Sequence, residues 1–144
     1  MKVLVATDGS KGSTQASIVV SKMAKEDPNL EIHLITVMDP SAGLVFAEPE
    51  ETSVLPHLNE TLASEAQTAL ERTEEVFADA GVKVASKSAS WGDPATVICQ
   101  TADEQDMDMI VVGSRGMGEI SGLILGSVSD KIVHRCSKPV MIVR

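Results

Sequence analysis

Four small residues near the end of the chain have a spacing suited to holding a negatively charged group. Gly113, Gly116, Gly126 and Ser127 follow the pattern G-x2-G-x9-G-S. Glycines let backbone N–H groups turn toward an anion, and the first turn of a helix favours negative charge. Together with the Ser127 hydroxyl group, the pattern predicts a site for a polyphosphate. A flexible loop followed by an ordinary helix cap is the alternative interpretation.

The elements that must position these residues alternate between strand and helix. Short apolar or alternating runs predict five strands, at residues 2–7, 30–37, 82–90, 107–113 and 138–144. Helical spacing and cap residues predict four helices: one beginning with Ser13 as N-cap and ending before Pro28, and others at 56–80, 92–105 and 127–135. Asp93 is the expected N-cap of the third of these, with Pro94 in its first turn.

This order predicts a single α/β domain over residues 1–144. Alternating strands and helices indicate a three-layer sandwich around a five-stranded parallel sheet, with the Rossmann-like strand order 3-2-1-4-5. The winding reverses between the first and fourth strands, and ligands bind at the carboxyl ends of strands at such a point. Thr7-Asp8-Gly9 ends the first strand and Val112-Gly113-Ser114 ends the fourth. The predicted anion site therefore lies where this fold binds ligands.

Composition excludes several classes of partner. The 144 residues carry a formal net charge of −9, which repels nucleic-acid phosphates and anionic membrane surfaces. One Trp, two Phe and no Tyr are too few to stack on the bases of a single strand. No apolar run approaches the length of a membrane span, and no signal segment precedes the first strand. We expect a cytoplasmic protein that binds neither nucleic acid nor membranes.

The two cysteines, Cys99 and Cys136, match no metal-binding spacing. Each occupies an apolar-facing position of an expected helix or its end. We interpret both as small buried hydrophobic residues rather than as a disulfide pair or a nucleophile.

The glycine pattern, with VLVATDGS near the start and GDPATVI in the middle, resembles the universal stress protein family over the whole chain. The resemblance implies a fold of the adenine nucleotide alpha hydrolase type and places the chain in the ATP-binding subgroup. It implies that Asp8 lies near the ribose and Mg²⁺-bound phosphates, as the metal ligand, and that the Val37 backbone meets adenine. The full set of residues it implies for ATP is Ala6, Thr7, Asp8, Val37, Gly113, Ser114, Arg115, Gly116, Gly118, Gly126, Ser127, Val128 and Ser129.

The resemblance also implies a stress-response or signalling role. The sequence shows no base poised for a water nucleophile, no arginine finger beyond Arg115 and no catalytic dyad, so we expect ATP hydrolysis, if any, to be slow and incidental. It implies a homodimer formed through the last strand, Pro139 to Arg144, and the edge position of that apolar strand independently favours pairing. Two alternatives stay open: an interaction protein of the same fold that acts without nucleotide, and a receiver-like phospho-switch. The chain lacks a P-loop motif, and its near-match to GxGxxG follows the wrong strand for NAD.

Overall fold

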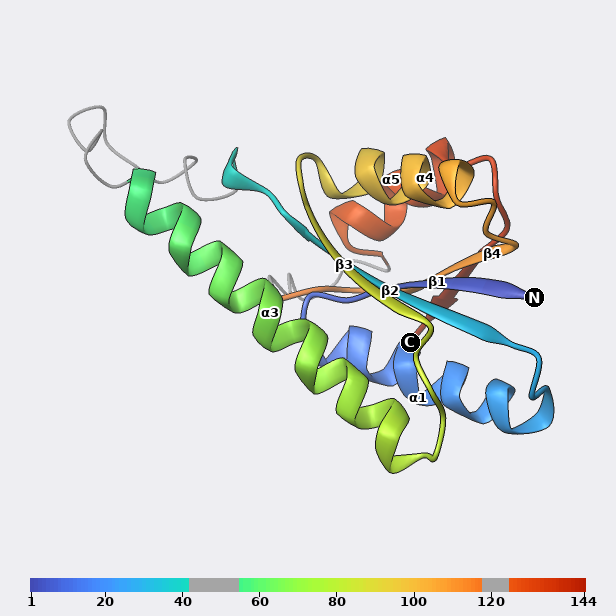
Figure 1. Cartoon of the computed structure of the whole chain (residues 1–144). Coiled ribbons are helices and arrows are strands. Elements are labelled where there is room, and N and C mark those ends of the chain that lie inside the picture. The colour runs from blue at the N-terminus through green and yellow to red at the C-terminus, as the bar shows by residue number, and fades with distance from the viewer. Residues whose placement is uncertain (42–54, 118–124) are drawn as a thin grey trace.

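The computed structural model describes residues 1–41, 55–117 and 125–144 (Figure 1). Its strands are β1 (Lys2–Ala6), β2 (Glu31–Met38), β3 (Ser86–Trp91), β4 (Met109–Gly113) and β5 (Val140–Val143). Its helices are α1 (Lys11–Glu26), α3 (Leu55–Asp79), α4 (Pro94–Glu104) and α5 (Ser127–Arg135).

The strands form one parallel sheet in the order β3-β2-β1-β4-β5, which confirms the predicted topology. Helices α1 and α3 cover one face, where Val20 and Phe77 pack on Val3 and Val5. Helices α4 and α5 cover the other face, where Ile98 and Ile132 join a separate apolar cluster (Figure 1). Receiver domains use the order 2-1-3-4-5, so the observed order argues against the receiver-like alternative.

Helix caps show where local sequence was informative and where it misled. Asp93 is the N-cap of α4, accepting from the Thr96 backbone N–H at 3.0 Å, with Pro94 in the first position as predicted. The predicted cap of α1 at Ser13 is wrong. Ser10 is the cap, because its hydroxyl oxygen accepts from the Ser13 N–H at 3.2 Å. Ser13 instead lies buried in the first turn of α1.

The predicted third strand begins too early. Residues 82–85 are not part of the strand, and the ladder between β2 and β3 begins where His33 pairs with Ser86. Val82 and Val84 pack against the apolar cluster under α1 and α3, so their alternation reflects burial of a connecting segment rather than sheet pairing. β3 itself is a mostly exposed edge strand, in agreement with the half-exposed strand that was expected.

The interpretation of the two cysteines is wrong. Cys99 and Cys136 form a disulfide, with their Cα atoms 5.0 Å apart, and both side chains are half-buried. They are separated by 37 positions in the sequence. The crossover through β4 places α5 beside α4 on the same face of the sheet, which brings the two sulfur atoms together. Spacing along the chain alone does not reveal such a contact.

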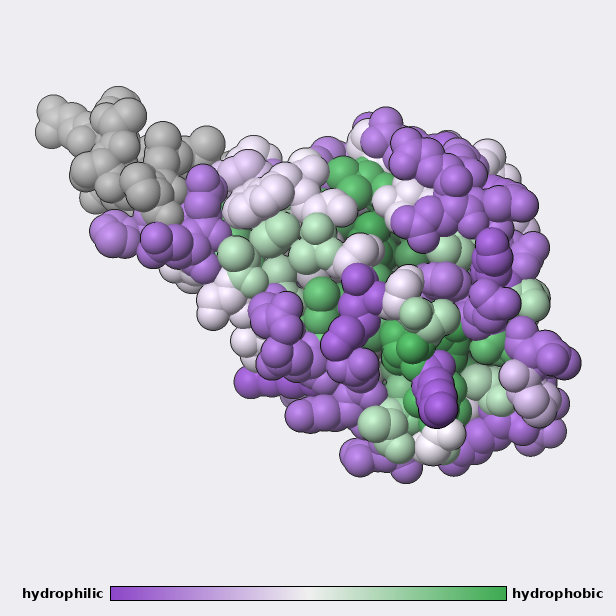
Figure 2. All heavy atoms as spheres, in the orientation of Figure 1, coloured by the Kyte–Doolittle hydropathy of each residue, from purple (hydrophilic) through white to green (hydrophobic). Residues whose placement is uncertain are grey.

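Hydrophilic side chains dominate the outer surface of the helices, while apolar side chains show between the helical layers (Figure 2). Within the described residues, no helix combines the length and apolar character that a membrane crossing requires.

Candidate functional site

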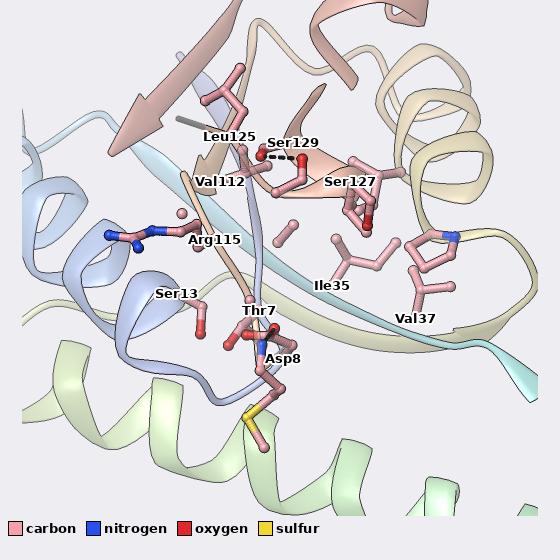
Figure 3. Close-up of a pocket in the computed structure, with 18 residues that line it drawn as sticks. Thr7, Asp8, Ser13, Ile35, Val37, Val112, Arg115, Leu125, Ser127 and Ser129 are labelled. Carbon is pink, nitrogen blue, oxygen red and sulfur yellow. Dashed lines mark hydrogen bonds between the residues drawn. The ribbon is translucent and has the colours of Figure 1, made fainter. Parts of the chain in front are cut away.

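A pocket of about 370 Å³ opens at the carboxyl ends of β1, β2 and β4 (Figure 3). This is the edge of the sheet where the winding reverses, and the volume falls in the range typical of small-molecule sites. The first turns of α4 and α5 complete its wall. Its lining consists of Ala6, Thr7, Asp8, Ser13, Ile35, Val37, Pro94, Ile98, Val112, Gly113, Arg115, Gly116, Met117, Leu125, Gly126, Ser127, Val128 and Ser129.

The pocket has a polar side and an apolar side. Thr7, Asp8 and Ser13 gather on one side, whereas Ile35 and Val37 lie on another (Figure 3). Pro94 and Ile98 of α4 extend the apolar side, and Ile98 is buried. A ligand with one flat apolar end and one anionic end would match this division.

Asp8 anchors the glycine loop to the end of β1. One of its carboxylate oxygens accepts from the Ser10 N–H at 3.0 Å, and the other accepts from the Met117 N–H at 3.2 Å. The side chain is exposed, so lone pairs remain free to face a ligand or a cation. Asp8 therefore has a structural role in addition to the metal-binding role implied for it.

A buried hydrogen-bond chain fixes the turn beneath Asp8. The Thr7 hydroxyl oxygen accepts from the Gly9 N–H at 3.2 Å and lies 2.8 Å from the Thr73 hydroxyl oxygen. Thr73 in turn donates to the Ala69 carbonyl at 2.7 Å. Gly9 has a φ of +77°, which favours glycine there. The polar side of the pocket is thus braced from behind by α3.

The glycines of the loop serve close packing within the protein. A Cβ atom at Gly113 would lie 2.5 Å from the Gly12 main chain, and one at Gly116 would lie 2.5 Å from the Asp8 carboxylate. Positive φ values occur at Gly9, Gly81 and Gly92, not at Gly113, Gly116 or Gly126. The nest of inward-turned N–H groups predicted for Gly113 and Gly116 is therefore not supported by their backbone angles, whereas binding of an anion stays a prediction.

The first turn of α5 lines the pocket with Ser127, Val128 and Ser129. Its N-cap, Gly126, makes no side-chain hydrogen bond to the first turn. Ser114 secures this end, because its carbonyl accepts from the Gly126 N–H at 2.7 Å and from the Ser129 hydroxyl group at 2.9 Å. Uncapped N–H groups together with the helix dipole favour an anion beside Ser127.

Charge in the pocket is sparse. Among the described lining residues, Asp8 is the one acid and Arg115 the one base. Arg115 is exposed, and its guanidinium group points away from Ile35 and Val37 (Figure 3). In the described parts of the chain, no group of three or more metal-binding side chains comes together. A cation here would depend on Asp8, water and the ligand's own oxygens, an arrangement that suits Mg²⁺.

The pocket brings together most of the residues that the resemblance implied. Ser114 lies buried behind the pocket, and Gly118 lies outside the described residues; the rest of that set lines it. Sequence reasoning missed Ser13, Ile35, Pro94, Ile98, Val112, Met117 and Leu125. Pro94 and Ile98, spaced i and i+4, carried a detectable signal, because that spacing places both on one face of α4.

Comparison with known proteins agrees with this geometry. The model of the universal stress protein family matches residues 1–144. The universal stress protein YxiE of Bacillus subtilis is 34% identical, with 99% of this chain and 98% of that protein covered.

Solved structures share the fold. The hypothetical protein MJ0577 of Methanocaldococcus jannaschii, the subject of a structure-based assignment of biochemical function, superimposes with a TM-score of 0.83 at 27% identity. The match covers 99% of this chain and 94% of that one. A family member from Arabidopsis thaliana, solved with AMP bound, gives a TM-score of 0.66 at 24% identity, covering 99% of this chain and 90% of that one.

Proposed function

Because this chain belongs to the universal stress protein family, we propose that it binds ATP in the pocket at the ends of β1, β2 and β4. The observation that carries the proposal is the division of one pocket into an apolar side and a polar side. Adenine requires the apolar side, and a triphosphate chain requires the polar side. The Arabidopsis neighbour with AMP bound indicates which ligand class to test first.

In this proposal the apolar side receives the base. Ile35, Pro94 and Ile98 supply flat apolar contacts, and the backbone of Val37 at the end of β2 hydrogen-bonds to adenine. Ala6 and Thr7 underlie the sugar, with Asp8 and Gly113 beside its hydroxyl groups. Burial of the base excludes water, which strengthens those hydrogen bonds.

The phosphates occupy the polar side, near the uncapped start of α5. Gly116, Gly126 and Ser127 surround them, and the N–H groups of Val128 and Ser129 face them from the first turn. Arg115 would neutralise charge after its side chain turns inward. Mg²⁺ would be held by Asp8 together with phosphate oxygens and water, since this ion retains water and takes few protein carboxylates.

The proposed role is nucleotide-dependent binding rather than catalysis. Asp8 is the one acid among the described lining residues, and its two oxygens hold the loop through backbone N–H groups, so the described lining supplies no acid without a structural role. ATP hydrolysis would be slow and incidental. We propose that the protein acts in stress response in the cytoplasm, as a homodimer whose partner contact is β5.

Titration calorimetry tests the proposal. The purified protein in the presence of Mg²⁺ is titrated with ATP and, separately, with AMP and with GTP. The proposal predicts saturable binding of one ATP per chain and weaker binding of GTP, because the adenine-facing groups are fixed by β2. Absence of a binding signal with both adenine nucleotides would contradict it. Binding of AMP but not ATP would retain the base site and reject the phosphate assignment.

A further inference from the structure

The disulfide between Cys99 and Cys136 joins the two helices that wall the pocket. Cys99 directly follows Ile98, which lines the apolar side. Cys136 is the C-cap of α5, and the same helix supplies Ser127, Val128 and Ser129 to the pocket at its other end. The covalent link therefore acts on both walls at once.

A cluster of apolar side chains connects the disulfide to the pocket wall. Cys136 donates its N–H to the Ile132 carbonyl at 3.0 Å, and Ile132 is fully buried in one cluster with Ala95 and Ile98. Val128, one turn earlier on α5, packs against the same cluster and reaches the pocket. Because side chains in such a cluster are close-packed, a tilt of α5 relative to α4 would move the pocket wall.

Besides the buried apolar cluster, solvent-exposed polar contacts link the two helices and the residues just beyond them, among them Arg135 with Asp93 at 3.9 Å. Lys131 contacts the Asp93 carboxylate at 3.0 Å, the Ser137 hydroxyl group donates to Asp103 at 2.5 Å, and Lys138 contacts Asp106 at 3.0 Å. Exposed ion pairs contribute little to stability, because water and salt screen the charges. At the pocket end, α5 is secured to Ser114 by two hydrogen bonds. With the disulfide open, the far end of α5 would be held to α4 by the apolar cluster and these polar contacts alone, which gives the helix more freedom to tilt.

We propose that the Cys99–Cys136 pair is a redox-sensitive staple that sets the nucleotide affinity of the pocket. This proposal rests on the proposed function. In the oxidised protein the staple holds α4 and α5 at the spacing that receives the nucleotide; in the reduced protein the spacing relaxes and affinity falls. Both cysteines are half-buried, so the pair is not enclosed in the core. In a reducing cytosol, disulfides are usually transient or redox-sensing.

The chemical step is thiol–disulfide exchange with a cellular dithiol. A thiolate of the dithiol attacks one sulfur of the pair, the S–S bond breaks, and a mixed disulfide forms. The second thiolate of the dithiol then displaces that sulfur. Two electrons pass to the protein, Cys99 and Cys136 take up protons as they become thiols, and the dithiol leaves as a disulfide.

Calorimetry with Mg·ATP on the oxidised protein and on protein kept reduced with dithiothreitol tests the staple. We expect about fivefold weaker binding after reduction, within the usual range of coupling between sites. The double variant Cys99→Ser/Cys136→Ser should match the reduced protein with or without dithiothreitol. Lys138→Ala, which removes an exposed link but keeps the disulfide, should retain the redox response. Circular dichroism verifies that each form is folded. Equal affinities of the oxidised and reduced proteins would overturn the proposal.

Two further readouts separate this inference from the proposed function. Linkage requires ATP to stabilise the disulfide by the same factor, so fivefold coupling shifts its reduction potential by about 20 mV in a glutathione buffer. Amide hydrogen exchange without nucleotide should be faster over residues 127–135 in the reduced protein. If neither form binds ATP, the proposed function fails, and the exchange measurement alone decides on the staple: equal rates in both forms overturn it.

Discussion

At the scale of single residues, Asp8 and Gly116 form the most informative pair. The Asp8 carboxylate both tethers the loop through the Met117 N–H and occupies the space that a side chain at Gly116 would need. The glycine there is required by the protein's own packing, and the gap that it leaves is part of the pocket. The shape of the loop and the space in the pocket therefore have the same cause.

Replacing Gly116 with valine should abolish ATP binding. Its Cβ would lie 2.5 Å from an Asp8 oxygen, so either the carboxylate or the loop must move. Calorimetry on Gly116→Val measures the loss. The matched control is Met117→Val, which adds a β-branched residue at the next position, where the side chain is 76% exposed and the N–H to Asp8 is kept. Unchanged affinity in Gly116→Val would remove this loop from the site.

The metal prediction also belongs to Asp8. A chain with a net charge of −9 would have to bind a polyphosphate through local groups, since long-range fields are screened over about 8 Å in physiological salt. EDTA should therefore weaken ATP binding by the wild-type protein, and Asp8→Asn should show little further loss on adding EDTA. Asp39→Asn, a carboxylate at the end of β2 that caps Ser41 outside the pocket, should keep the full EDTA effect. Equal wild-type affinity with and without EDTA would contradict a metal at Asp8.

At the scale of elements, the first turn of α4 combines stability and site geometry. Asp93 accepts from the Thr96 N–H and hydroxyl group, and Lys131 of α5 donates to it. The backbone hydrogen bond from Thr96, then its hydroxyl group and Lys131, lower the pKa of Asp93 to about 2. The same carboxylate thus begins α4 beside Pro94 and links that helix to α5.

This pKa gives a pH-dependent contribution with a definite sign. Because the folded-state pKa lies below the usual value of 3.8, the stabilisation is present above about pH 4 and is lost as the pH falls toward 2. Asp93→Ala should lower the free energy of unfolding at pH 7 by about 1 kcal/mol, the usual effect of losing an N-cap. The free energies of unfolding of wild type and Asp93→Asn, measured by urea denaturation, should converge as the pH falls from about 4 to about 2. A difference between them that is constant over that range would show that the ionised carboxylate contributes nothing.

At the scale of the whole molecule, the two edges of the sheet differ in kind. β3 presents Lys87 and several serines, which discourage pairing with another strand. β5 presents the apolar run VMIV and has no described neighbour beyond it. This asymmetry favours β5 as the contact of a two-fold dimer.

The hydrogen-bond pattern shows which residue of β5 a partner strand would use. The carbonyls of Pro139 and Val143 accept from the N–H groups of Ile110 and Ser114 in or just after β4. Because the backbone groups of every second residue of a strand point to the same side, those of Met141 also face β4. The backbone of Ile142 faces the open edge. Ile142→Pro should therefore give monomers by light scattering, whereas Met141→Pro should lower the stability of the sheet itself. A wild-type protein that is monomeric at micromolar concentration, with and without ATP, would exclude the dimer.

The sequence predicted the strand order because buried apolar runs, caps and crossovers are local signals with few consistent topologies. It placed Asp8, Gly113 and Ser127 together for the same reason. It missed the Cys99–Cys136 disulfide and the position of Ile98 in the pocket wall, because both depend on how α4 and α5 pack. It also misassigned the cause of Gly113, because the close approach of Gly12 arises only in the folded chain.

The central claim is that ATP occupies this particular pocket, and NMR titration of ¹⁵N-labelled protein with Mg·ATP tests it most directly. The account predicts saturable chemical-shift changes at Ala6, Val37, Gly113 and Ser127, which lie far apart in the sequence, and none at Lys25 or Asp79, at the far ends of α1 and α3. Shift changes confined to other parts of the chain, or none at saturating ATP, would contradict the account.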